Sequence, residues 1–279
     1  MIKGQLTGIG SLPHQDADAA LDLIFKYMPT GPHWPQLPKM SAQEGFIQQY
    51  LQPLFSLQML YLDENKVPHF RDNEKDWTEK LTKFYQLYLD IESAQDDRQY
   101  LSLFAFPQET AHGFYKFVNK DFSSYPVKPF FVKGQVSGPV TVGLQVVASD
   151  GVPAFYRDDL RDILLKTLAF NALWQVKLLQ EKKLPVLLFI DDPGLVAYGQ
   201  STTVALSRAL ITKALAEMVA VLKNAGALVG VHCCAGIDWS ILFELDLDIV
   251  SFDAFNYFDS LLVYTSSLSD FLDRGGVLG

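Results

Sequence analysis

Short apolar runs alternate with amphipathic helical segments along most of this chain, and this alternation constrains the fold more than any other feature. Short strands separated by helices are expected to pair in parallel. Eight of them predict an α/β fold of the (β/α)8 TIM-barrel type, which keeps its chemistry at the carboxyl ends of the strands. The expected strands cover residues 5–9, 33–37, 101–105, 130–136, 186–191, 227–232, 248–252 and 276–279.

The last expected strand is the weakest of the eight, with only about four residues and no helix after it. We therefore expect a barrel that is completed unconventionally or that lacks its last strand or helix. The whole chain, residues 1–279, is expected to form this single domain. Its helical segments are predicted at residues 41–97, 109–117, 158–182 and 202–224, with another that extends to Leu272.

Composition and charge narrow the classes of partner. The net charge of −9 argues against nucleic acid or an anionic membrane surface as the main partner. No apolar run approaches the length of a membrane span, and the first residues lack the apolar core of a signal peptide. The two cysteines are adjacent and cannot form an ordinary structural disulfide, so a cytoplasmic location is expected.

The stretch from Ala227 to Asp253 contains the clearest candidate for a metal site. Alternate side chains of a strand point to opposite faces, so His232 and Cys234 are expected to share one face while Cys233 points to the other. Imidazole and thiolate are common zinc ligands, and Asp253 could supply a third. The alternative is that the cysteines are buried and inert, with the histidine hydrogen-bonded beside them.

Two carboxylates, Asp191 and Asp192, end the most clearly buried strand of the sequence. Adjacent acids are costly to bury, so they indicate ligand binding or catalysis, or else the capping of a helix. An earlier strand carries Lys133, Gln135 and Ser137 at alternating positions before a Gly-Pro turn, which is a good place for hydrogen bonds to a ligand.

The N-terminal segments supply further candidates for a binding site. Ser11 and His14 would stand at the mouth of the first strand, although this stretch can also be a plain strand–turn–helix junction. The proline-rich loop from Pro32 to Pro38 can place Trp34 and Gln36 over a pocket, or it can pack around a buried tryptophan.

Five short motifs, GIGSLP, VSGPVT, IDDPGL, HCC and DIVSFD, follow one another along the chain. In this order they resemble motifs of the C-terminal barrel of cobalamin-independent methionine synthase. That barrel belongs to the superfamily of uroporphyrinogen decarboxylases and corrinoid methyltransferases. The chain is most similar to the short, single-barrel methionine synthase-like proteins.

The resemblance implies roles for particular residues. His232 and Cys234 match two zinc ligands, and Asp253 falls where the synthase has a glutamate ligand. The carboxylates of the Asp-Glu-Pro motif, one of which holds the amino group of homocysteine, fall on Asp191 and Asp192. The loop that contacts the carboxylate of the amino acid falls on Ile9, Gly10 and Ser11. The synthase's last zinc ligand, a cysteine, has no counterpart in this sequence.

The leading hypothesis is therefore zinc-dependent methyl transfer to a thiol such as homocysteine. Trp34 and Gln135 would shape the pocket, and the methyl donor would be a methylfolate or a methylcorrinoid protein. One alternative is a decarboxylase of the uroporphyrinogen type, although the arginines which that chemistry needs do not occur before Arg71. The other is a barrel that binds a metal or a small amino acid without catalysis.

Overall fold

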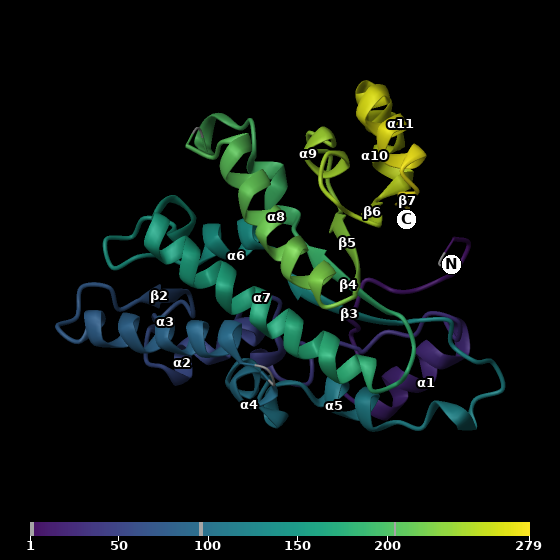
Figure 1. Cartoon of the computed structure of the whole chain (residues 1–279), viewed down its shortest axis with the longest axis horizontal. Helices are drawn as coiled ribbons and strands as arrows, with labels where there is room; N and C mark the ends of the chain where they lie inside the picture. The colour runs from purple at the N-terminus through teal and green to yellow at the C-terminus, as the bar shows by residue number, and fades with distance from the viewer. Residues whose placement is uncertain (1–2, 95–96, 204) are drawn as a thin grey trace.

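A five-stranded parallel sheet forms the framework of the computed structural model, which describes residues 3–94, 97–203 and 205–279. The strands lie in the sheet in the order in which they occur in the sequence (Figure 1). They are β3 (Val132–Ser137), β4 (Val186–Asp191), β5 (Leu228–Cys233), β6 (Ile249–Phe252) and β7 (Val277–Leu278).

The prediction of a (β/α)8 barrel is wrong. The described residues form seven strands, five in the parallel sheet and two in a small antiparallel sheet, which are too few for a complete eight-stranded barrel. The expected strand at residues 101–105 is helical, in α4 (Arg98–Leu101) and η3 (Ser102–Phe104). Leu101 and Phe104 are buried while Leu103 is 52% exposed, so the apolar run has the three-residue spacing of a helix rather than the two-residue spacing of a strand.

Neither of the two expected strands nearest the N-terminus is a regular strand, because residues 5–9 form no bridge and residues 33–37 form only isolated ones. Ser11 pairs with Gln36, and His33 pairs with Lys133 at the edge of β3. Gly8 interrupts the first segment and Pro35 the second, and a proline has no N–H to donate to a ladder. These segments therefore lie beside the sheet without becoming regular strands.

Helices cover one face of the parallel sheet. α7 (Asp158–Gln180) contacts β3 and β4, and α8 (Arg208–Asn224) packs beside α7 and against β5 (Figure 1). The other helices of the described chain are α1 (Ala17–Tyr27), α2 (Gln52–Ser56), α3 (Trp77–Ser93), α5 (His112–Asn119), α6 (Pro139–Gln145), α9 (Ser240–Phe243), α10 (Ala254–Leu261) and α11 (Thr265–Asp273). Among the described helices, none is long and apolar enough to cross a membrane.

The sheet is apolar on both faces, which explains why its strands are nearly continuous apolar runs. Side chains such as Val136, Ile190 and Val231 join the large core between the sheet and the helices. A smaller cluster occupies the opposite face and consists of Phe131, Leu187, Phe189 and Ile249. We call this opposite face the inner face of the sheet.

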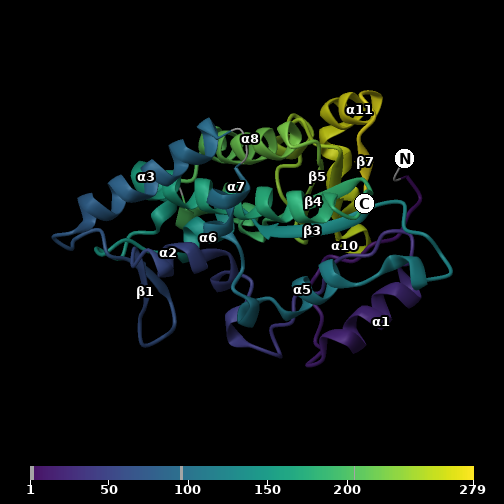
Figure 2. The ribbon, with the colours of Figure 1, turned by 60° about the horizontal axis from the view of Figure 1, so that its bottom comes forward.

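The region predicted as helical between residues 41 and 97 is only partly so. α3 lies where the aromatic helical spacing predicted a helix, but β1 (Leu60–Leu62) and β2 (Pro68–Phe70) form an antiparallel hairpin before it (Figure 2). The carboxylate of Asp63 accepts a hydrogen bond from the Val67 backbone across the turn, at 2.7 Å.

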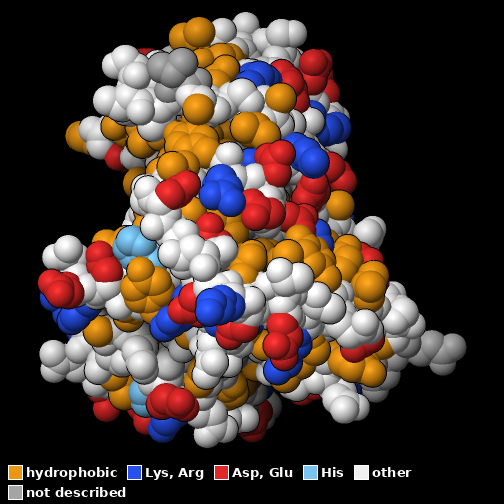
Figure 3. Space-filling view, turned by 90° about the vertical axis from the view of Figure 1, so that its left-hand side faces the viewer, with side chains coloured by type: hydrophobic (Ala, Val, Ile, Leu, Met, Phe, Trp, Pro, Cys, Tyr) orange, Lys and Arg blue, Asp and Glu red, His pale blue; other side chains and the backbone are white. Residues whose placement is uncertain are grey.

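The face of the molecule seen from the left of Figure 1 mixes charged side chains of both signs with apolar ones (Figure 3).

Short 3₁₀ helices connect the main elements. They are η1 (Ala42–Glu44), η2 (Gln48–Leu51), η4 (Gln108–Thr110), η5 (Phe122–Ser124), η6 (Ala154–Tyr156), η7 (Pro193–Ala197), η8 (Ser201–Thr203) and η9 (Leu262–Tyr264).

Candidate functional site

A row of polar side chains crosses the inner face of the sheet at the carboxyl ends of four strands. The register places Ser137 of β3 opposite Asp191 of β4, Asp191 opposite His232 of β5, and His232 opposite Ser251 of β6. The ring nitrogen Nδ1 of His232 lies 3.0 Å from the hydroxyl of Ser251. We refer to these four residues as the polar row.

Asp191 is the most unusual member of the polar row. Its side chain is 5% exposed, and its Oδ1 atom is buried without a hydrogen-bond partner among the residues that the structure describes. Burial disfavours the charged carboxylate and raises the pKa of Asp191 to about 7, although the nearby positive charge of Lys133 opposes this shift. An unpartnered buried acceptor is costly, so it identifies a place where a ligand can donate a hydrogen bond.

Lys133 brings a positive charge to the same face. It is 1% exposed, and its Nζ atom donates to the backbone oxygen of Ile9 and, at 3.4 Å, to Oε1 of Gln135. Burial lowers the pKa of Lys133 to about 8, while the charge of Asp191 acts in the opposite direction. The two charges influence each other through space but form no direct ion pair within the described part of the chain.

The strand β5 separates its histidine from its first cysteine. Cys233 is fully buried in the core on the helix side, where burial raises the pKa of its thiol to about 12. His232 lies on the inner face as part of the polar row. Its pKa is lowered to about 4, mainly by burial and to a smaller extent by the charge of Lys133. Cys234 is exposed just beyond the end of the strand. His232 is therefore neutral near pH 7 and keeps a nitrogen lone pair.

Asp192 holds the beginning of helix α6. The carboxylate is fully buried and accepts hydrogen bonds from the backbone of Val140 at 3.1 Å, the backbone of Thr141 at 2.8 Å and the hydroxyl of Thr141 at 2.5 Å. A Cβ atom at Gly138 would lie 2.2 Å from this side chain, so only glycine fits there. Of the two interpretations of Asp192, helix capping fits these contacts.

Asp253 caps a helix as well. It precedes α10, and its Oδ1 atom accepts hydrogen bonds from the backbone of Phe255 at 3.1 Å and of Asn256 at 3.2 Å. Its other oxygen accepts from the side-chain amide of Asn256. These bonds lower the pKa of Asp253, with the side chain of Asn256 as the largest cause.

The expected zinc ligands do not form a closed metal site. No three histidine, cysteine, aspartate or glutamate side chains of the described residues come together in a group that could hold a metal ion. Asp253 is bonded to the first turn of α10, and zinc binding by His232, Cys234 and Asp253 stays a prediction.

The N-terminal loop packs directly against β3. Gly10 has a φ of +145°, and a Cβ atom there would lie 2.6 Å from the side chain of Gln135. The exposed Ser11 donates a hydrogen bond to Oε1 of Gln36 at 2.6 Å, and the side chain of Ile9 is 47% exposed. The Nδ1 atom of His14 is buried without a partner among the described residues.

The remaining expected site residues have contacts within the protein. Trp34 is fully buried, and its indole N–H donates to Gln175 of α7 at 3.0 Å, so it packs in the core on the helix side. The side-chain amide of Gln135 donates to the backbone oxygen of Trp34 at 3.2 Å. Ser137 donates to the backbone oxygen of Phe46.

Three residues of this region were not among the predicted site residues: Thr7, His33 and Ser251. Neither ring nitrogen of the buried His33, nor the hydroxyl of Thr7, has a hydrogen-bond partner in the described part of the chain. Ser251 precedes Asp253 by two residues, so strand alternation alone could have placed it on the inner face. No sequence pattern identifies Thr7 or His33.

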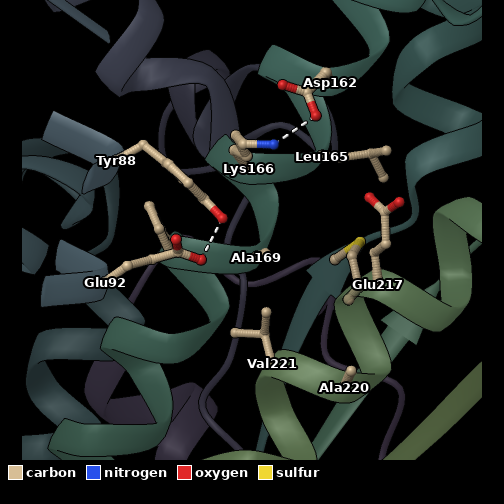
Figure 4. Close-up of a pocket in the computed structure, with 11 residues that line it drawn as sticks. Tyr88, Glu92, Asp162, Leu165, Lys166, Ala169, Glu217, Ala220 and Val221 are labelled. Carbon is tan, nitrogen blue, oxygen red and sulfur yellow. Dashed lines mark hydrogen bonds and ion pairs between the residues drawn. The ribbon is translucent and has the colours of Figure 1, made fainter. Parts of the chain in front are cut away.

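A separate hollow of about 400 Å³ lies between α3, α7 and α8 (Figure 4). Four of its polar groups form two pairs, since Lys166 bonds to Asp162 and the hydroxyl of Tyr88 bonds to Glu92 (Figure 4). It lies on the helical side of the sheet, away from the polar row, and we assign no chemistry to it.

Comparison with known proteins assigns the chain to no family. No family model matches the chain, and no curated protein matches it.

Proposed function

We propose that this chain binds a small amino-acid thiol at the polar row and presents its sulfur to a methyl donor. The observation that carries the proposal is the buried Oδ1 atom of Asp191, which has no hydrogen-bond partner among the described residues. An ammonium group on the ligand would donate the missing hydrogen bond and stabilise the ionised carboxylate. The similarity of five ordered motifs to methionine synthase supplies the class of ligand, and homocysteine is its simplest member.

The positions of the polar groups suggest how the ligand would be oriented. With its ammonium group on Asp191, the carboxylate of the ligand is assigned to the loop from Ile9 to Ser11. The sulfur is assigned to the end of β5, where His232 is neutral and Cys234 is exposed. A neutral imidazole can accept a hydrogen bond from the thiol.

Methyl transfer forms a sulfur–carbon bond while the bond between the donor and its methyl group breaks, and the thiol proton is released. A methylcorrinoid protein or a methylfolate is proposed as the donor, and the cytoplasm as the location. Zinc would favour the thiolate form of the substrate. Because the described residues do not gather three ligands, we assign no step to a metal.

The proposal is tested by comparing the binding of homocysteine with the binding of the same thiol without its amino group. Asp191→Asn should weaken homocysteine binding by about 10- to 100-fold, as expected for a hydrogen bond to a charged group. The same variant should leave the thiol without an amino group unaffected. Asp63→Asn is the matched control, because it changes a carboxylate in the turn between β1 and β2, where Asp63 accepts a hydrogen bond from the Val67 backbone.

Equal losses for the two thiols would contradict the role of Asp191. If homocysteine binds but neither donor yields a methylated product, the chain is an amino-acid-binding protein and not a methyltransferase.

A further inference from the structure

A cavity of about 220 Å³ lies between the inner face of the sheet and the N-terminal segment from Gly4 to Ile9. The N-terminal and C-terminal segments lie near each other on this side of the molecule (Figure 1). Residues of β3, β4, β6 and β7 or directly beside them line the cavity, together with the segment itself. Its apolar wall consists mainly of Phe131, Leu187, Phe189, Ile249, Val277 and Leu278.

Four polar side chains of the described residues line this cavity, and each can donate a hydrogen bond. They are Gln5, Thr7, Lys133 and Ser251, and the Thr7 hydroxyl is buried without a hydrogen-bond partner among the described residues. The Nζ atom of Lys133 lies 5.0 Å from the centre of the Phe189 ring, which forms part of the wall. Among the residues that the structure describes, no carboxylate side chain lines the cavity.

Lys133 is a buried cation whose hydrogen-bond acceptors are neutral. They are the backbone oxygen of Ile9 and the side-chain oxygen of Gln135, and an ammonium group has three N–H donors. Buried charges are normally paired, because an unpaired charge loses its hydration without compensation. Asp191 attracts this ammonium group only through space, so an anion in the cavity would give it a hydrogen-bonded charged partner that it lacks among the described residues.

We propose that the cavity binds a small aliphatic carboxylic acid, with its carboxylate on Lys133 and its hydrocarbon chain between the strands. The cavity is large enough for several non-hydrogen atoms, as in a short-chain acid, since a volume of about 220 Å³ exceeds the roughly 30 Å³ of one water several times. Inorganic phosphate fits less well, because the remaining wall is apolar and offers few donors to a strongly hydrated anion.

This site adjoins the proposed thiol site, and the two share Ile9 and Ser251. The central residues of the thiol site, Asp191 and His232 at the carboxyl ends of β4 and β5, do not line the cavity. Lys133 lies near the beginning of β3, four residues before Ser137 of the polar row. Binding of the acid can therefore be measured without a thiol or a methyl donor, so its failure would not affect the proposed function.

Calorimetric titration of the unmodified protein with butanoate, pentanoate and hexanoate at pH 7 is the first test. Affinity should rise roughly fourfold with each added methylene group, because each one leaves water for the apolar wall. Hexylamine has the same chain with the opposite charge and should not bind. A flat series, or equal binding of hexylamine and hexanoate, would overturn the proposal.

The second test removes the cation. Lys133→Met should weaken hexanoate binding by about 10- to 100-fold, as expected for the loss of a bond to a charged group. The control is Lys213→Met, at a lysine on α8 whose side chain is 74% exposed, and it should bind as the unmodified protein does. Unchanged binding by folded Lys133→Met would also refute the site, and the chain-length series decides the question if that variant does not fold.

Discussion

Replacing Asp191 by asparagine should make the protein more stable at pH 8, although the residue stands at the centre of the proposed site. Asparagine has nearly the same shape but no charge to bury. The Oδ1 atom of Asp191 has no partner within the described residues, so this substitution removes no hydrogen bond from that atom. A residue that lowers stability where it stands is typical of a binding or catalytic role.

The size and sign of the effect follow from the pKa of Asp191, which burial raises from 3.8 to about 7 in the folded chain. The folded state therefore holds this proton more tightly than the unfolded state, and folding loses stability as the pH rises from about 4 to about 7. At 1.36 kcal/mol for each pKa unit, the ionised carboxylate costs about 4 kcal/mol above that range. This pKa already includes the attraction of Lys133, so we expect the variant to gain up to about 4 kcal/mol at pH 8.

Urea denaturation at pH 4 and pH 8 measures this difference. Asp191→Asn should match the unmodified protein at pH 4 and exceed it at pH 8. The matched control is Glu44→Gln, because the buried Glu44 accepts bonds from the backbone of Leu37 and from the backbone and ring of His112, each at 3.1 Å or less. That variant should lose about 1–3 kcal/mol. An Asp191→Asn variant less stable than the unmodified protein at pH 8 would refute the reasoning.

Two further predictions concern the metal and the N-terminal loop. If His232 and Cys234 bind zinc together, elemental analysis should find far less zinc in Cys234→Ser than in Cys233→Ser, and equal losses would contradict a shared face for the two ligands. Gly10→Ala should lower the free energy of unfolding by about 2–4 kcal/mol, because the backbone at φ +145° is unfavourable for alanine and its Cβ would meet Gln135. Gly199→Ala, at φ +81° with open space around it, should lose only about 1 kcal/mol, and equal losses in thermal or urea unfolding would mean that the contact with Gln135 is unimportant.

The central strands could be predicted because they are buried on both faces. An apolar run bounded by glycine, proline or acidic residues predicted residues 186–191, and β4 covers Val186–Asp191. The long helix predicted at residues 158–182 is α7, Asp158–Gln180. The predicted number of strands was wrong for two reasons. Periodicity does not reveal which extended segments complete a hydrogen-bonded ladder. In addition, the apolar run at residues 101–105 fits a buried helix as well as it fits a strand.

The sequence predicted toward which face of the sheet the site's side chains point, but not which groups they contact. Strand alternation correctly separates Cys233, in the core, from His232 on the inner face. The cap that Asp192 forms involves Val140 and Thr141, about fifty residues away in sequence, and no local pattern indicates such a contact. For the same reason the sequence did not distinguish Asp191, which lacks a partner for one oxygen, from Asp192, whose carboxylate is fully bonded.

The strands of the parallel sheet lie in the same order as in the chain, and this order has a consequence for folding during synthesis. Each of the strands from β4 to β7 pairs with the strand made just before it, so its partner is already present when it leaves the ribosome. β3 in turn follows the extended segment at His33 that lies on its other edge. Growth of the sheet can therefore keep pace with translation, and only the newest edge is exposed to pairing with other chains at any moment.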